Sequence, residues 1–138
     1  MKSITYITLS LFILTLIGCS QMSKKLDVII KNNSLCFFTN DPATDYYDSN
    51  KELFIYMSKL EHKKEITTIF EKKYINRPLP IKQENCLEIP LSQFKKNIAY
   101  SVVLDISHTY VAEVCLKSKN NQLIVKEIVV GETTCPAD

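Results

Sequence analysis

The chain has 138 residues, and its 17 Lys and Arg against 15 Asp and Glu give a formal net charge of only +2 at neutral pH. This balance argues against nucleic acid as a partner, because nucleic-acid binding needs a strongly basic surface. The length suits one domain of ordinary size with a real hydrophobic core, and leaves little room for a second.

The first residues predict export and lipid attachment. An apolar stretch from Ile4 to Leu16 is too short to span a bilayer but fits the core of a signal peptide. The residues from Leu16 to Cys19 then resemble the lipobox of bacterial lipoproteins, in which the chain is cut before the cysteine and its thiol carries the lipid. We therefore expect a signal peptide over residues 1–18, lipidation of Cys19, and a tether over residues 19–25.

The expected location is the outer membrane, with the domain facing the periplasm. Lipid chains on Cys19 would hold the protein to a membrane without crossing it. In bacteria with two membranes, Asp after the lipidated cysteine retains a lipoprotein in the inner membrane, and here the residue is Ser20. No later segment reaches 18 consecutive apolar residues, so we expect no second anchor.

Residues 26–138 are predicted to form an all-β domain, because short apolar stretches alternate with turn signals. The expected architecture is a small immunoglobulin-like antiparallel β-sandwich of about seven or eight short strands. The strands are expected at residues 26–31, 34–39, 51–61, 66–75, 86–91, 99–107, 110–117 and 123–130. Asn pairs at 32–33 and 120–121 tolerate positive φ and are expected to close hairpins.

Two segments are ambiguous. Residues 51–61 alternate apolar side chains as a strand does, but Leu53, Tyr56, Met57 and Leu60 also fit helical spacing. We choose a strand because the neighbouring segments are strand-like. Residues 40–50 are rich in Asp and are expected to be mostly loop, although the tyrosines at 46 and 47 could begin a strand.

Four cysteines follow the lipidation site: Cys36, Cys86, Cys115 and Cys135. An even number in an exported chain predicts two disulfides, for which three connectivities exist. Zinc would need closely spaced pairs, which these cysteines do not form. We pair Cys36 with Cys86 and Cys115 with Cys135. The second bridge requires the tail to reverse near Gly131, so that Cys135 returns to the level where Cys115 faces Lys126 across the last hairpin.

No catalytic motif stands out, so we expect no enzyme, no cofactor and no metal site. Asp105, Ser107 and His108 superficially suggest a catalytic triad. Adjacent residues on a strand point to opposite faces, so we expect a turn there instead. His62 is expected to be an exposed loop residue.

The most suggestive surface group lies in the loop at residues 40–50. Asp45, Tyr46, Tyr47 and Asp48 form an acidic, aromatic segment, and tyrosine is favoured at protein interfaces. The alternative is a solvated loop with one or two tyrosines packed beneath it. Calcium is less well supported, because the ordered spacing of a calcium loop is missing.

This order of features resembles the small enterobacterial lipoproteins described as type VI secretion immunity periplasmic lipoproteins. The resemblance rests on the lipobox and tether, Cys36-Phe37 at a strand end, Tyr46-Tyr47, and Cys86-Leu87 opening a later strand. It covers most of the domain. In that family the first two cysteines form the common pair, which supports Cys36 with Cys86, whereas Cys115 with Cys135 is an added bridge.

The resemblance implies an immunity protein that binds and occludes a toxin in the periplasm. This role needs a rigid scaffold and a complementary surface, but no catalysis. The alternative is a structural or assembly lipoprotein of the cell envelope, which would share the same sequence features. In either case we expect a membrane-anchored binding module with a protein partner.

Overall fold

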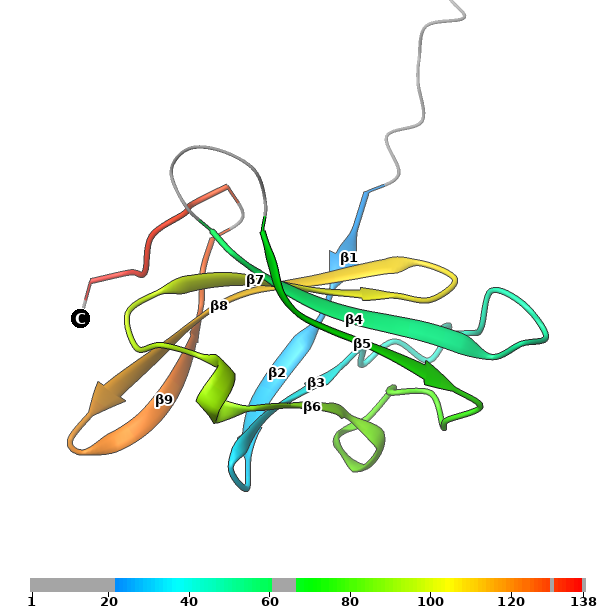
Figure 1. Cartoon of the computed structure of the whole chain (residues 1–138), viewed down its shortest axis with the longest axis horizontal. Helices are drawn as coiled ribbons and strands as arrows, with labels where there is room; N and C mark the ends of the chain where they lie inside the picture. Colours follow the sequence, from blue (N-terminus) through cyan, green and yellow to red (C-terminus); the bar gives the residue numbers. More distant parts are fainter. Residues whose placement is uncertain (1–21, 61–66, 130, 138) are drawn as a thin grey trace, which may run out of the picture.

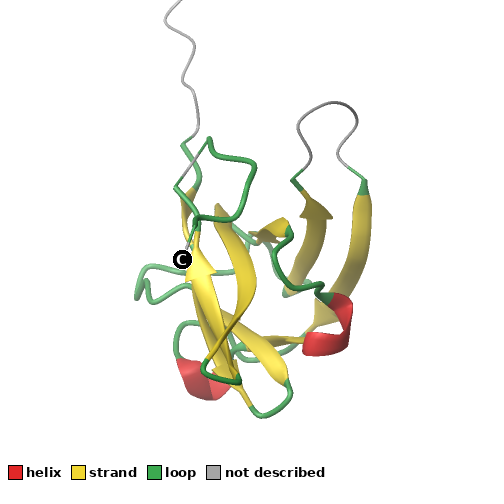
Figure 2. Cartoon of the chain, turned by 90° about the vertical axis from the view of Figure 1, so that its left-hand side faces the viewer, coloured by secondary structure: helices red, strands yellow, loops and turns green. Residues whose placement is uncertain are grey.

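The computed structural model describes residues 22–60, 67–129 and 131–137. Almost all of the regular structure in these residues is β-strand, joined by loops and by two short 3-10 turns (Figure 2). Within these residues the strands are β1 (Lys24–Lys25), β2 (Asp27–Lys31), β3 (Ser34–Phe38), β4 (Glu52–Lys59), β5 (Thr68–Ile75), β6 (Leu87–Pro90), β7 (Ala99–Asp105), β8 (Thr109–Lys119) and β9 (Gln122–Glu127). The 3-10 turns are η2 (Gln83–Asn85) and η3 (Leu91–Gln93).

The strands form two sheets packed together, which confirms the predicted all-β sandwich. The larger sheet has the order β1-β8-β7-β4-β5, with β9 also paired to β8. The smaller sheet has the order β2-β3-β6 and lies against the larger one (Figure 1). Among the described strands, all pairs are antiparallel except β1 with β8, which run parallel. The described strands number nine because β1 is formed by two residues that the sequence assigned to the tether.

The core follows from the alternation of side chains along each strand. Successive residues of a strand point to opposite faces, so one apolar set per strand is buried between the sheets. The buried cluster includes Leu53, Ile55 and Met57 from β4, Tyr100, Val102 and Leu104 from β7, Tyr110, Ala112, Val114 and Leu116 from β8, and Leu35, Phe37, Leu87 and Ile89 from the smaller sheet. Phe94 closes one end, with its ring edge-on to Tyr100 at 5.2 Å between centroids.

The ambiguous segment at residues 51–61 contains a strand, as we chose. β4 lies between β5 and β7, so its backbone is paired on both sides.

For residues 40–50, the possibility that a strand begins at Tyr46 or Tyr47 was wrong. Asp48 accepts the backbone N–H of Asn50 at 3.0 Å, a local turn that competes with strand pairing. The strand begins only at Glu52.

The predicted asparagine turns are present. Asn32 has φ 55°, and Asn120 and Asn121 have φ 50° and 61°. Asparagine tolerates this left-handed conformation better than most residues, and paired positive φ values suit the right-handed twist of a two-residue hairpin. The resulting register places Cys115 opposite Lys126, as expected.

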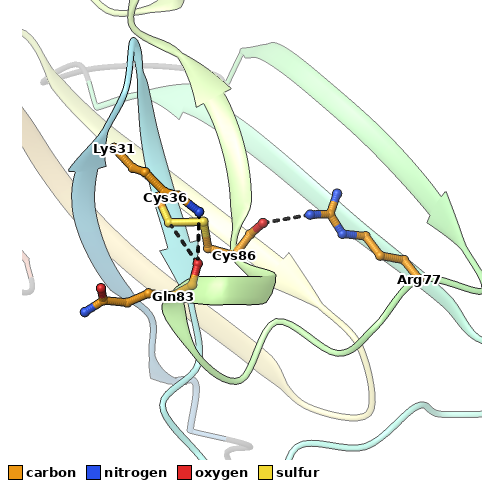
Figure 3. The surroundings of a disulfide bond; sticks show 5 residues. All are labelled: Lys31, Cys36, Arg77, Gln83 and Cys86. Atoms are coloured by element: carbon orange, nitrogen blue, oxygen red, sulfur yellow. Dashed lines mark hydrogen bonds between the residues drawn. A yellow bond between two sulfur atoms is a disulfide. The ribbon is translucent and has the colours of Figure 1, made fainter.

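The first disulfide joins Cys36 to Cys86, with 5.4 Å between their Cα atoms. It connects the middle of β3 to the residue before β6, so it links two neighbouring strands of the smaller sheet covalently. Figure 3 shows that Arg77 donates from its guanidinium to the carbonyl of Cys86, at 2.8 Å. This contact holds the chain that follows β5 against the bridge.

The second disulfide joins Cys115 to Cys135, with 5.7 Å between Cα atoms. The C-terminal tail leaves the ladder after β9 and folds back, and Gly131 has φ 96°, consistent with the expected reversal. The tail then covers part of the outer face of the larger sheet. Ile128 packs there with Ala99 and Cys115, and Lys117 donates a hydrogen bond to the carbonyl of Pro136.

Candidate binding surface

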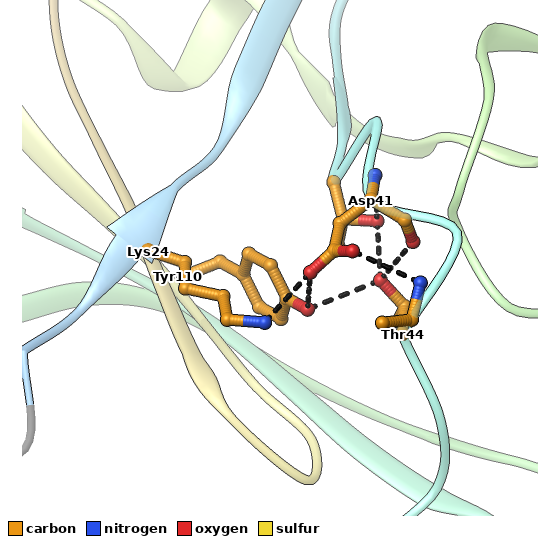
Figure 4. A network of polar contacts seen from close by, with 6 residues as sticks. Lys24, Asp41, Thr44 and Tyr110 are labelled. Carbon is orange, nitrogen blue, oxygen red and sulfur yellow. Dashed lines mark hydrogen bonds and ion pairs between the residues drawn. The ribbon is translucent and has the colours of Figure 1, made fainter.

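The loop at residues 40–50 is held to the sandwich by a polar network of Lys24, Asp41, Thr44 and Tyr110. The Lys24 ammonium lies 2.8 Å from the Asp41 carboxylate, and the Tyr110 hydroxyl donates to the same oxygen at 2.9 Å (Figure 4). Thr44 lies 3.1 Å from the Tyr110 hydroxyl, and its backbone N–H donates to the Asp41 carbonyl. The network therefore joins β1, β8 and the first half of the loop.

The charges of this network are stabilised by their neighbours. The Lys24 ammonium, the Ala43 N–H and the Tyr110 hydroxyl lower the pKa of Asp41 from 3.8 to about 2. The hydrogen bond to Asp41 raises the pKa of Lys24, while burial is the main cause that raises the pKa of Tyr110. All three groups keep their ordinary charge states at neutral pH, so the network serves to position the loop.

The second half of the loop carries the four residues singled out in the sequence, and the structure divides them. Asp45 accepts the N–H of Tyr46 at 2.8 Å, and its carbonyl accepts the N–H of Ser107 at 3.4 Å. Tyr46 packs against the hydrophobic core, and burial raises its pKa. Tyr47 is 82% exposed, and Asp48 is also exposed. Asp45 and Tyr46 thus build the loop, whereas Tyr47 and Asp48 are available to a partner.

Tyr47 and Asp48 lie at the edge of a hollow of about 420 Å³. The other lining residues are Glu52 and Phe54 from the start of β4, and residues 105–109 around the turn between β7 and β8. Phe54 is on the outer face of the sheet because its neighbours Leu53 and Ile55 face the core. In the register it pairs with Asp105 of β7.

A second hollow of about 310 Å³ continues from the first across the same sheet face. Phe54 and Asp105 belong to both hollows, and Tyr56, Thr68 and Glu71 complete the second. We call the combined surface the aromatic-acidic face. It is formed by Tyr47, Phe54 and Tyr56 together with Asp48, Glu52, Glu71 and Asp105.

One lysine moderates the negative charge of the aromatic-acidic face. Lys73 lies 2.7 Å from Glu52 and 5.4 Å from the centre of the Phe54 ring. Asp105 accepts a hydrogen bond from the Thr109 hydroxyl at 3.3 Å. Burial raises the pKa of Tyr56, and the charge of Asp105 raises it further. Four carboxylates against one lysine leave this face negative.

Phe54, Tyr56 and Glu52 were not predicted as site residues from the sequence. The sequence did contain a signal for the two aromatic residues. If residues 51–61 form a strand with Leu53 and Ile55 facing the core, Phe54 and Tyr56 must face outwards. Asp105 was considered only as part of a possible triad. Asp105, Ser107 and His108 all line the first hollow, and residues 106–108 form a bend between strands, as predicted.

The tether enters the domain beside this surface. Met22, Ser23 and Lys24 border a small hollow together with His108 and Thr109, which also line the first hollow. Leu26, two residues later, is fully buried and donates its N–H to the carbonyl of Val111 at 2.9 Å. The predicted lipidation site, Cys19, and His62 lie outside the described residues.

No protein-family model, curated protein or solved structure matches this chain. Among the described residues there is no helix long and apolar enough to cross a membrane. Across residues 22–60, 67–129 and 131–137, no group of three or more metal-ligating side chains comes together.

Proposed function

We propose that this protein is a lipid-anchored lipoprotein of the outer membrane that acts in the periplasm by binding another protein. The observation that carries the binding role is the aromatic-acidic face. Tyr47, Phe54 and Tyr56 lie along two connected hollows, with carboxylates around them. Aromatic residues are enriched at protein interfaces and supply much of their binding energy.

The charge of this face favours a partner with a basic surface. A projecting basic loop could place an aliphatic stem against Phe54 and a cationic end near Asp48 and Asp105. Complementary charge would mainly increase the rate of association and exclude wrong partners. The polar network around Asp41 fixes the first half of the loop that carries Tyr47 and Asp48, and a loop fixed in advance loses less entropy on binding.

We propose a toxin as the partner, on the strength of the resemblance to type VI secretion immunity lipoproteins. An immunity protein of this kind would neutralise the toxin by covering it. A lipid anchor at Cys19 would place the domain in the compartment where the toxin arrives. The alternative is an assembly lipoprotein of the envelope, which would use the same face to hold a structural component.

Co-culture tests the immunity role. A strain lacking the gene should be killed by its parent and should be rescued when the gene is supplied in trans. Survival of the deletion strain at the parental level, together with a defect in envelope assembly, would favour the alternative role.

Variants in the rescue experiment test the binding face. Tyr47→Ala combined with Asp105→Asn should lose protection because these changes remove an aromatic contact and a charge from the first hollow. Leu123→Ala, on β9, removes another exposed large side chain and serves as the matched control. Full protection by the Tyr47 and Asp105 variant, at equal protein level, would show that another surface binds the toxin.

A further inference from the structure

A second surface, of opposite charge, lies where the sandwich is open at one side. β5 is the last strand of the larger sheet, and β6 is the last strand of the smaller one. A hollow of about 500 Å³ separates them, and we call it the edge groove. It is lined by Phe70, Lys72 and Tyr74 from β5, by Arg77, and by Ser34, Glu88 and Pro90 from the smaller sheet and its end.

Lys72 occupies an unusual position in this groove. It pairs in register with Ile55, whose side chain is buried in the core, so Lys72 projects from the core-facing side of β5. Phe70 and Tyr74 project from the same side and pack partly against the core. A lysine can occupy this side because the smaller sheet does not extend over it, and its charge remains in solvent.

Lys72 and Arg77 are both placed by the same aromatic ring. The Lys72 ammonium and the Arg77 guanidinium each lie 4.8 Å from the centre of the Tyr74 ring. Arg77 is fixed further by its hydrogen bond to the Cys86 carbonyl (Figure 3). Within the part of the chain that the structure describes, neither cation is in an ion pair with a carboxylate. Glu88 also lines the groove, which leaves two cations against one carboxylate.

The strand edges suggest the shape of the ligand. Among the described strands, β5 has eight residues and is paired on one side only, whereas β6 has four residues and ends in Pro90, which has no N–H to donate. An extended peptide can therefore pair with β5 and place alternate side chains against Phe70 and Tyr74. Lysines on edge strands also serve to discourage such pairing. A lysine that only discourages strand pairing would not need a second cation held beside it. Here Arg77 is held beside Lys72 by the Tyr74 ring and by the hydrogen bond to the Cys86 carbonyl.

We propose that the edge groove binds an extended acidic segment of a partner protein. The segment adds to β5 as a further strand and places a carboxylate against Lys72 and Arg77. Hydrogen bonds between a guanidinium or ammonium and a carboxylate are stronger than neutral ones, so this contact selects acidic sequences. This binding requires neither the aromatic-acidic face nor lipid attachment.

Peptide titration tests this proposal on the purified domain with both disulfides formed. The probe is the peptide acetyl-Glu-Val-Glu-Val-Glu-amide, and acetyl-Lys-Val-Lys-Val-Lys-amide is its charge-reversed counterpart. The acidic peptide should shift the NMR amide signals of Thr68–Ile75 and slow the hydrogen exchange of outward-facing amides in β5. Its binding should weaken as salt is raised, because exposed charges are screened.

Lys72→Gln should weaken binding of the acidic peptide by about tenfold, the effect of losing one charge-assisted hydrogen bond. The matched control is Lys119→Gln, which removes an exposed lysine at the end of β8 and should leave the affinity unchanged. Both side chains are exposed, so both variants should fold, as a thermal melt will verify.

Three results would overturn the proposal. The first is equal binding of the acidic and basic peptides, or no binding of either. The second is equal weakening by the two lysine variants, which would mean that only net charge matters. The third is a concentration-dependent dimer that is lost in Lys72→Glu, because β5 would then pair with a second copy of this chain.

Discussion

At the scale of single residues, Asp41 has the largest structural role among the charged side chains near the loop. Its carboxylate forms an ion pair with the Lys24 ammonium and accepts hydrogen bonds from the Tyr110 hydroxyl and the Ala43 N–H. These contacts connect three segments that are far apart in the sequence. The role of Asp41 could not be predicted, because nothing in a single sequence shows that Tyr110 and Lys24 lie beside it.

Asp41→Asn should lower the thermal unfolding midpoint at neutral pH. The pKa of Asp41 is lowered to about 2 from 3.8, so its ionised form stabilises the fold above about pH 4. This contribution is lost as the pH falls from about 4 to about 2. The wild type and Asp41→Asn should therefore converge in stability over that range when both are melted across pH.

The control for Asp41→Asn is Glu84→Gln, an exposed carboxylate in η2. It should leave the midpoint nearly unchanged, as surface substitutions usually do. A constant difference between wild type and Asp41→Asn from neutral pH down to pH 2 would contradict the role assigned to the ionised carboxylate.

Glu113 is a partly buried carboxylate, and burial disfavours its charged form. It projects from β8 beneath the C-terminal tail, and its Oε2 atom has no hydrogen-bond partner among the described residues. Burial raises its pKa above the ordinary 4.5, and a hydrogen bond from the Gly131 N–H only partly opposes this. A raised pKa means that ionisation of Glu113 costs stability as the pH rises through the folded-state value.

Glu113→Gln should therefore be more stable than the wild type at neutral pH. The amide keeps the shape and an acceptor oxygen for Gly131, but it carries no charge. The gain should disappear below about pH 4, where Glu113 is protonated in both the folded and the unfolded chain. Urea unfolding at neutral and acidic pH measures this, and a variant less stable than wild type at neutral pH would contradict it.

At the scale of elements, local patterns predicted most strands and turns correctly. Alternating residues such as Tyr110, Ala112 and Val114 predicted β8, and the asparagine pairs predicted the hairpins. Alternation alone left residues 51–61 ambiguous, and the strand-like neighbouring segments decided for the strand that buries Leu53 and Ile55. These features depend on neighbours in the sequence, which a single sequence contains.

Pairings between distant segments could not be predicted in the same way. The parallel pairing of β1 with β8 places Lys24 opposite Tyr110. β1 has only two residues, which is too short for a periodic pattern that would predict a strand. The aromatic-acidic face likewise depends on β4, β7 and the loop before β4 meeting in three dimensions. The sequence therefore indicated Tyr47 and Asp48 but missed Phe54.

The two disulfides should stabilise the fold by different amounts. In the chain-entropy model, the bridge between Cys36 and Cys86, separated by 50 positions, is worth roughly 4 kcal/mol, and the bridge between Cys115 and Cys135, separated by 20, roughly 3 kcal/mol. Replacing each pair by alanine and measuring urea unfolding tests these values. A larger loss from the shorter bridge would contradict the order.

Removing the second bridge should also have a local effect. Without Cys115–Cys135 the tail loses its covalent link to β8, so the amide of Ile128 should exchange faster with solvent. The amides of β4, at the centre of the larger sheet, should change only as much as the global stability does. Hydrogen exchange measured in both alanine pairs separates the local from the global effect.

At the scale of the whole molecule, the domain presents surfaces of opposite charge. The aromatic-acidic face is negative, while the edge groove between β5 and β6 carries Lys72 and Arg77. The near-zero formal net charge of the chain conceals this separation. Composition alone could therefore argue against nucleic acid, but could not reveal two surfaces of opposite charge.

The proposed anchor makes a prediction for the whole protein in cells. Cys19→Ser should abolish incorporation of labelled palmitate and release the protein from the membrane fraction, because serine cannot form the thioether to the lipid. Ser20→Asp should keep the label but move the protein to the inner membrane. Palmitate labelling that persists in Cys19→Ser would contradict lipid attachment at this residue.

The position of β1 limits how far a lipidated domain could travel. Five positions separate Cys19 from Lys24, where the chain joins the larger sheet, and a fully extended chain of that length spans at most roughly 18 Å. The domain would then stay within a thin layer at the bilayer surface. A partner would have to be met in that layer, and the chance of capture would follow the number of copies per unit area of membrane.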